Sequence, residues 1–169
     1  NVEQRKIQSL VLAPTRELCI QIANDIKNFA SKMRGVKVVP VYGGESIVVQ
    51  YKQLDVQPQV LVATPGRLID LINRGKVDLS EVRFLVLDEA DEMLNMGFLD
   101  DIKYILGASP RERQTALFSA TMPTPILRIS QRFQREPHHI KGDDGQTAFD
   151  LIDQYYCEVP KNKKSGCAG

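Results

Sequence analysis

The sequence predicts an α/β fold in which helices cover both faces of a doubly wound parallel sheet. Two observations predict it: short apolar runs recur along the chain, and they alternate with segments of helical periodicity. Runs that are apolar throughout, rather than at every second residue, are typical of strands that are buried on both faces. A chain that alternates such strands with helices forms parallel pairs through right-handed crossovers.

Five apolar runs are predicted to be the strands of the sheet, and a sixth, weaker run follows them. Each is short and is bounded by polar residues or by glycine and proline, as expected for buried strands. The predicted strands are Leu10–Ala13, Val36–Val41, Val60–Ala63, Phe84–Leu87 and Thr115–Phe118, with the weaker one near His138–Ile140.

The clearest helix is predicted between the first two strands. One apolar stripe with spacings of 4, 4, 3 and 4 residues is formed by Leu18, Ile22, Ile26, Phe29 and Met33. This spacing places all five side chains on one face of a helix. Gly35 follows the stripe at a position suited to end the helix.

Two Thr-Pro pairs, Thr64-Pro65 and Thr124-Pro125, predict further helix starts. Each offers a hydroxyl side chain as the N-cap and a proline at the first helical position. Apolar periodicity predicts two more helices between the fourth and fifth strands. The later predicted helices are Leu68–Asn73, Ala90–Met96, Leu99–Leu106 and Ile126–Phe133.

Composition limits the classes of function that the chain can serve. The net charge is +1, so any binding of nucleic acid must depend on a local surface and on backbone donors. The three cysteines have no C-x-x-C spacing, which argues against a zinc site or a disulfide framework and favours a cytoplasmic protein. No apolar stretch approaches the roughly 18 residues of a membrane span, so we expect no membrane partner.

The chain is expected to hold one domain and the beginning of another segment. We assign residues 1–141 to the domain and the polar stretch 142–150 to a linker. Residues 151–169 contain one isolated strand-like run, Ile152–Val159, which is predicted to begin a second domain or a tail. The chain starts without methionine, and we expect it to begin inside a larger protein.

An acidic motif, Asp88-Glu89-Ala90-Asp91, directly follows the apolar run Phe84–Leu87. A buried parallel strand would deliver these carboxylates to the carboxyl edge of the sheet, where open α/β sheets bind ligands. Buried carboxylates need a compensating cation, and Mg²⁺ on a nucleotide is the usual one. Taken alone, four residues could equally form an acidic strand-to-helix junction beside a helix N-terminus.

Other motifs follow the other predicted strands in a fixed order. They are Pro14-Thr15-Arg16-Glu17-Leu18, Gly43-Gly44, Thr64-Pro65-Gly66-Arg67 and Ser119-Ala120-Thr121, with the acidic motif before the last. Over about residues 9–140 the sequence closely resembles the first RecA-like domain of DEAD-box ATP-dependent RNA helicases, most of all the bacterial cold-shock group. The five motifs together make this resemblance specific.

The resemblance implies an ATP site at the acidic motif. It implies that Asp88 holds Mg²⁺, usually through water, and that Glu89 orients or deprotonates the attacking water, the two tasks that phosphoryl transfer requires. It further implies that Asp91 reports the state of the nucleotide by hydrogen bonding to Ser119 and Thr121. Without the resemblance, these two hydroxyls would be read as ordinary capping or turn residues.

The remaining motifs predict an RNA-binding surface. Helix N-termini offer backbone donors to phosphates, glycines allow close approach of a backbone, and arginines grip phosphate oxygens with a planar fork. Such contacts position a single-stranded or duplex RNA without reading its sequence. Each motif alone could be a capped turn with a solvated arginine. The predicted RNA-binding residues are Pro14, Thr15, Arg16, Gly43, Gly44, Thr64, Pro65, Gly66 and Arg67.

The phosphate loop G-x-x-x-x-G-K-[ST] does not occur in the 169 residues. In the family it should precede residue 9, on a strand that we place beside Phe84–Leu87. We therefore expect Mg²⁺ and ATP to bind weakly or not at all to this chain, and the chain alone to be inactive. We also expect a vacant position beside Phe84–Leu87, filled by Ile152–Val159 or by a strand of a second copy in a homodimer.

The sequence thus predicts a fragment of a helicase that couples ATP hydrolysis to RNA unwinding in the intact enzyme. Two alternatives stay open at this point. The chain could be a non-enzymatic module that binds RNA or a protein partner, because its RNA motifs stand beside an incomplete ATP site. It could also be a structural remnant without a function of its own.

Overall fold

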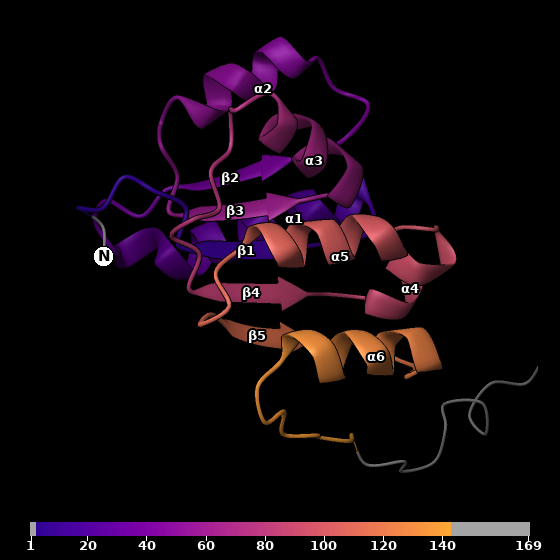
Figure 1. Ribbon diagram of the computed structural model, residues 1–169. Coiled ribbons are helices and arrows are strands. Elements are labelled where there is room, and N and C mark those ends of the chain that lie inside the picture. The colour runs from indigo at the N-terminus through magenta and orange to yellow at the C-terminus, as the bar shows by residue number, and fades with distance from the viewer. Residues whose placement is uncertain (1–2, 143–169) are drawn as a thin grey trace, which may run out of the picture. The chain divides into compact units, whose positions relative to one another are not determined.

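The computed structural model describes residues 3–142 and contains one five-stranded parallel sheet (Figure 1). The spatial order of the strands is β2-β3-β1-β4-β5. Short runs of apolar residues form them because both faces of the central strands are covered. The strands are β1 (Ser9–Leu12), β2 (Val38–Val41), β3 (Val60–Ala63), β4 (Phe84–Leu87) and β5 (Gln114–Leu117).

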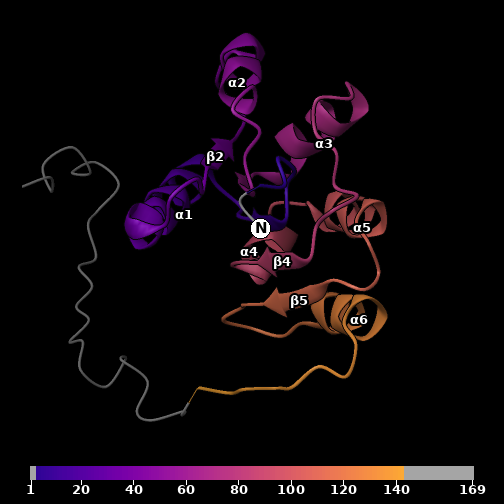
Figure 2. The same cartoon turned by 90° about the vertical axis from the view of Figure 1, so that its left-hand side faces the viewer.

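The helices lie on the two faces of this sheet, with α1 on one face and α3, α5 and α6 on the other (Figure 2). Their bounds are α1 (Arg16–Phe29), α2 (Ile47–Leu54), α3 (Pro65–Asn73), α4 (Ala90–Asn95), α5 (Leu99–Ala108) and α6 (Thr124–Phe133), and a short 3₁₀ turn, Ala30–Lys32, follows α1. All these elements lie in the compact unit that ends at Pro137. The doubly wound α/β fold is confirmed.

Two apolar cores form because successive residues of each strand face opposite sides of the sheet. Leu10 and Leu12 face the helices α3 to α6, whereas Val11 and Ala13 face α1. The first core is the larger, with fully buried residues such as Leu68 on α3. The position of the sheet is therefore fixed mainly by the face that carries α3 to α6.

The stripe that predicted α1 is only partly buried. The side chains of Phe29 and Met33 are 83% and 62% exposed, and Met33 lies beyond the α-helix, so the predicted stripe of five residues on one helical face is wrong at its end. A helix of 14 residues is about 21 Å long, whereas strands of 4 residues span only about 13 Å, so the helix extends past the sheet. The α-helix ends at Phe29, well before Gly35, which we predicted to end it.

Three further expectations are corrected. His138–Ile140 forms no strand, and all three residues are exposed. Pro123, not Thr124, is the N-cap of α6, and Thr124 is already helical. The helix α2 had no predicted range, because its run Ile47-Val48-Val49 is β-branched and such residues have low helix propensity.

The position beside Phe84–Leu87 is not vacant, so the prediction of an empty slot there is wrong. The strand β4 pairs in parallel with β1 on one side and with β5 on the other, and Leu85 is aligned with Leu10 and with Thr115. The strand that closes this position comes from residues 114–117 of the same chain. The segment Ile152–Val159, which we expected to fill the position, lies outside the described residues, as do residues 151–169 and nearly all of 142–150.

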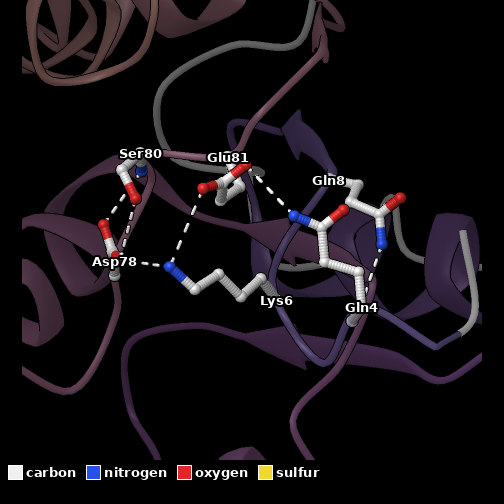
Figure 3. A network of polar contacts seen from close by, with 6 residues as sticks. All are labelled: Gln4, Lys6, Gln8, Asp78, Ser80 and Glu81. Atoms are coloured by element: carbon white, nitrogen blue, oxygen red, sulfur yellow. Dashed lines mark hydrogen bonds and ion pairs between the residues drawn. The ribbon is translucent and has the colours of Figure 1, made fainter.

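A polar network ties the segment before β1 to the loop before β4 (Figure 3). Lys6 Nζ lies 3.8 Å from both Asp78 Oδ2 and Glu81 Oε1, and Gln4 Nε2 donates to Glu81 Oε2 at 3.1 Å. This network lies at the amino ends of the strands, away from every motif. Such exposed ion pairs contribute little to stability.

No helix among the described residues is long and apolar enough to cross a membrane.

Candidate functional site

The five motifs gather at the carboxyl edge of the sheet, because each follows a strand and all strands are parallel. The strand order divides them into two groups. The arginine side consists of residues 14–16, 42–45 and 64–67, which follow the adjacent strands β1, β2 and β3. The carboxylate side consists of residues 88–91 and 118–121, which follow β4 and β5.

Asp91 connects the two segments of the carboxylate side. Its Oδ2 accepts hydrogen bonds from the Thr121 backbone N–H at 2.9 Å and from Thr121 Oγ1 at 2.8 Å. The Asp91 backbone N–H donates to Ser119 Oγ at 3.1 Å. The Ala90 N–H also donates to the Phe118 carbonyl at 3.0 Å, so the start of α4 is fixed to the segment that follows β5.

Asp91 is ionised at neutral pH. Hydrogen bonds to the carboxylate, that from the Thr121 hydroxyl first, lower its pKa to about 2. Donors that stabilise the charged form shift a carboxyl group in this direction. The contact between Asp91 and Thr121 is therefore one between a full negative charge and two donors.

Asp88 and Glu89 mark the point at which the chain leaves β4. The Asp88 N–H still donates to the Leu12 carbonyl at 3.0 Å, which continues the strand pairing, and Asp88 Oδ1 accepts from the Glu89 N–H at 3.0 Å. Glu89 has φ 47°, in the left-handed region that residues other than glycine rarely adopt. This turn leaves the Glu89 side chain exposed at the edge, and such strained residues cluster at active sites.

The donor set fits a cation that arrives with a nucleotide better than a resident metal. No group of three or more His, Cys, Asp or Glu side chains within residues 3–142 could hold a metal ion. Mg²⁺ in phosphate sites takes only one or two carboxylates and completes its shell with phosphate oxygens and water. Asp88 suits this role, since its Oδ2 accepts no hydrogen bond within the described part of the chain.

On the arginine side, the helices α1 and α3 begin with different capping. Thr15 Oγ1 accepts a hydrogen bond from the Leu18 N–H at 3.2 Å and so caps α1. Thr64 occupies the N-cap position of α3, followed by Pro65 at N1, but its side chain makes no capping hydrogen bond. The first-turn N–H groups of α3 thus have no acceptor inside the helix, and Gly66 is exposed there.

Arg67 is held by protein partners on both arms. Its Nη1 donates to Gln50 Oε1 at 2.8 Å, and its Nη2 donates to the Glu45 carbonyl at 2.9 Å. Gln50 is 0% exposed, and its Nε2 donates to the Tyr42 carbonyl at 2.8 Å and to Glu45 Oε2 at 3.3 Å. The loop after β2 and the start of α3 are therefore joined through Gln50.

Arg16, the first residue of α1, contacts the same loop after β2. Its guanidinium stacks over the Tyr42 ring, 4.9 Å from the centroid. Gly44 has φ +80°, and a Cβ built on it would lie 3.9 Å from Arg16 Nη1. Burial raises the pKa of the Tyr42 hydroxyl, so this ring stays neutral beneath the cation. The structure thus brings Arg16, Gly44 and Arg67 to one surface.

Three residues of this surface were not found from the sequence: Tyr42, Glu45 and Gln50. Gln50 carried a usable signal, because it shares a helical face with Ile47 and Leu54, which pack against the core. A polar side chain inside an apolar stripe must find buried hydrogen-bond partners. Pro14, which we predicted to bind RNA, is buried before the start of α1, and its role stays a prediction.

Comparison with known proteins decides the family. Residues 1–129 match the DEAD/DEAH box helicase family. The chain belongs to this family. The resemblance inferred from the five motifs is thereby confirmed.

Similar DEAD-box proteins extend well beyond this chain. It is 51% identical to the DEAD-box ATP-dependent RNA helicase CshA of Geobacillus kaustophilus and 49% identical to CshA of Bacillus subtilis, in each case over 97% of this chain. The match spans only 35% and 33% of those two relatives.

Solved structures confirm the RecA-like fold of this DEAD-box chain. A DEAD box protein from Methanococcus jannaschii is 40% identical and superposes with a TM-score of 0.75, covering 95% of this chain and 42% of that one. A hypothetical ATP-dependent RNA helicase from Sulfolobus tokodaii is 41% identical with a TM-score of 0.74, covering 81% and 40%.

Proposed function

We propose that this chain is the part of a DEAD-box ATP-dependent RNA helicase that binds RNA phosphates on its arginine side and carries the Mg–ATP carboxylates on its carboxylate side. One observation carries the proposal: all five motifs meet at a single edge of the sheet, and Asp91 hydrogen-bonds to Thr121 across two of them. In the intact enzyme, this arrangement would couple ATP hydrolysis to RNA unwinding.

The arginine side is suited to a phosphate backbone. The exposed Arg16 lies over Tyr42, and the N-terminus of α3 presents backbone donors at Gly66. Gly43 and Gly44 have no side chains that would keep a strand of RNA at a distance. These groups contact phosphates and sugars rather than bases, so the binding would be independent of sequence. Contacts to 2′-hydroxyls would favour RNA over DNA.

The carboxylate side is suited to phosphoryl transfer. Asp88 would hold Mg²⁺ through water, and Glu89 would orient the attacking water or accept its proton. When bound, Mg²⁺ would neutralise the charge that develops on the phosphate oxygens. Asp91 would transmit the state of this site through Ser119 and Thr121 to the segment after β5.

ATP turnover with and without single-stranded RNA tests the proposal. The 169 residues contain no phosphate loop, so we expect turnover no greater than that of Glu89→Gln. A longer form that includes an upstream G-x-x-x-x-G-K-[ST] should hydrolyse ATP, respond to RNA, and lose this activity in Glu89→Gln. RNA-stimulated ATP turnover by the 169 residues alone would contradict our expectation that a chain without the phosphate loop is inactive.

A second candidate is a non-enzymatic module that binds RNA or a protein partner. It is favoured by the network of hydrogen bonds on the arginine side, all of whose members come from this side. Salt-sensitive RNA binding that is indifferent to ATP, with no turnover in the longer form, would favour this candidate. A cytoplasmic location stays a prediction, as do the linker at 142–150 and a homodimer.

A further inference from the structure

Gln50 is a fully buried polar side chain at the centre of the arginine side. We propose that it is a positioning residue, which holds Arg67 and the turn Tyr42–Glu45 in the arrangement that receives an RNA phosphate. The proposal rests on the RNA-binding function argued above. It assigns Gln50 no contact with RNA, and all of its effect is exerted through the residues that it holds.

The hydrogen bonds of Gln50 fix the direction of its amide. Its Oε1 faces a guanidinium donor of Arg67, and both hydrogens of Nε2 have acceptors, the Tyr42 carbonyl and Glu45 Oε2. Rotation of the amide by 180° would turn donors toward Arg67 and the oxygen toward the Tyr42 carbonyl. Because the group is shielded from water, no solvent could replace the broken hydrogen bonds, and the network is strongly specified.

Arg67 is prepared for a phosphate by this contact. A guanidinium has five N–H donors, and Gln50 and the Glu45 carbonyl use two of them, one on each arm. The remaining three stay in a fixed plane and can grip an anion. Since the side chain is already ordered, binding RNA would not have to restrict its rotamers, which is the usual gain from preorganisation.

The same amide also supports Arg16. The Tyr42 carbonyl accepts from Gln50, while the Tyr42 ring lies beneath the Arg16 guanidinium. Tyr42 precedes the Gly43-Gly44 pair, so its carbonyl anchors the start of the turn in which Gly44 adopts φ +80°. One neutral side chain on α2 therefore links two arginines that follow β1 and β3.

Gln53 provides a matched control on the same helix. It lies three residues after Gln50, and its Oε1 is buried without a hydrogen-bond partner among the described residues. It takes no part in the contacts of Arg67 or Tyr42. Methionine is close to glutamine in size and shape and forms no comparable hydrogen bonds, so Gln50→Met removes the network whereas Gln53→Met makes the same chemical change and leaves the network in place.

The experiment measures binding of a labelled single-stranded RNA to the 169-residue chain by fluorescence anisotropy over a series of salt concentrations. For Gln50→Met we expect the Kd to rise about tenfold, the effect of removing a hydrogen bond to a charged group. The slope of log K against log salt should fall by about 0.7 for each phosphate that the variant no longer binds. For Gln53→Met the Kd should stay within about twofold of the wild type and the slope should be unchanged, because this change leaves the network of Gln50 intact.

A double-mutant cycle with Arg67→Lys separates positioning from general stability. If Gln50 acts partly through Arg67, then Gln50→Met should weaken RNA binding less once Arg67 has been replaced than it does in the wild type, because only its effect through Tyr42 is left. Thermal melting of each variant checks that it is folded. If Gln50→Met does not fold, NMR of the wild type replaces it: the Arg67 guanidinium protons should exchange slowly with solvent and shift when RNA is added.

Three results would overturn the proposal. They are a Gln50→Met chain that binds RNA as tightly as the wild type, effects of Gln50→Met and Arg67→Lys that simply add, and a rapidly exchanging Arg67 guanidinium. Failure of the wild-type chain to bind RNA at all would instead overturn the proposed function, and with it the purpose assigned to Gln50. The two failures are thus told apart by the wild type alone.

Discussion

The arginine side and the carboxylate side share one edge of the sheet but are held together by opposite chemistry. The arginine side is organised by the neutral, fully buried amide of Gln50. The carboxylate side is organised by Asp91, an ionised group that remains partly exposed. A charged hub at the position of Gln50 would carry a large desolvation penalty, whereas Asp91 keeps contact with water.

The two sides differ in the side chains that join their segments and not in the strand pairing beneath them. On the arginine side, the strand ladder continues beyond β3, since the Thr64 N–H donates to the Val41 carbonyl and the Ala13 N–H to the Ala63 carbonyl, both at 3.0 Å. On the carboxylate side the ladder continues as well, since the Asp88 N–H donates to the Leu12 carbonyl at 3.0 Å and the Phe118 N–H to the Leu87 carbonyl at 2.8 Å. Asp91 adds hydrogen bonds to Ser119 and Thr121. The contrast therefore lies between a buried neutral side chain on one side and a partly exposed, ionised one on the other.

The largest effect is expected from breaking the turn of the arginine side with Gly44→Val. Gly44 has φ +80°, and a β-branched residue in this region costs about 1–3 kcal/mol of folding free energy. Urea unfolding should show this loss, and RNA binding should weaken with it. Gly43→Val is the matched control, because Gly43 lacks a positive φ and a Cβ at this position would have no atom within 4 Å. Equal losses of unfolding free energy in Gly44→Val and Gly43→Val would show that the positive φ of Gly44 is not the cause of the loss.

A smaller effect is expected from Thr121→Val on the carboxylate side. The change removes the hydrogen bond from Oγ1 to Asp91 and keeps the backbone one, which should cost about 1 kcal/mol in urea unfolding. Thr115→Val, on β5, is the control, since Thr115 Oγ1 is buried and has no hydrogen-bond partner among the described residues. That variant should be neutral or slightly more stable than the wild type, and the opposite ranking would show that the Asp91 contact is unimportant.

The smallest effect is a difference in pH dependence between the two sides. The pKa of Asp91 is about 2 in the folded chain against an ordinary 3.8, so the unfolded chain binds more protons in this interval. The stability contributed by Asp91 is therefore complete above about pH 4 and is lost as the pH falls through about 2. The difference in unfolding free energy between wild type and Asp91→Asn should shrink over this range, as measured by urea titrations at about pH 5, 4 and 3.

The cost of Gly44→Val serves as the reference for that titration, since strain at a glycine involves no proton. It should stay constant between about pH 5 and pH 3. A cost of Gly44→Val that changed in parallel with that of Asp91→Asn would mean that the two sides are not organised independently.

Local sequence patterns were sufficient to predict most of the helices and strands. The strands Val60–Ala63 and Phe84–Leu87 match their predicted bounds, because a short run that is apolar throughout is recognisable from its own residues. The helix α2 was not found in the same way, since its β-branched start favours strand and its burial depends on the sheet. The five motifs were also visible as sequence, and they identified the family.

Strand order could not be read from the sequence, and it changed the account of the site. We expected a gap beside β4, yet β5 pairs there and brings Thr121 to Asp91. Hydrophobic periodicity shows that a strand is buried but not which strand lies next to it, because that choice depends on packing between residues far apart in the chain. The pairing of Gln50 with Arg67 is of the same kind.

The sequence by itself determined the family, the α/β class and the residue types that stand at the strand ends, because each of these depends on short stretches of chain. Only the tertiary structure decided the division of the edge into an arginine side and a carboxylate side, and the hub at Gln50. Both follow from the order β2-β3-β1-β4-β5 and from burial, which the whole packed domain sets. A buried polar residue acquires its role from partners that the sequence leaves distant.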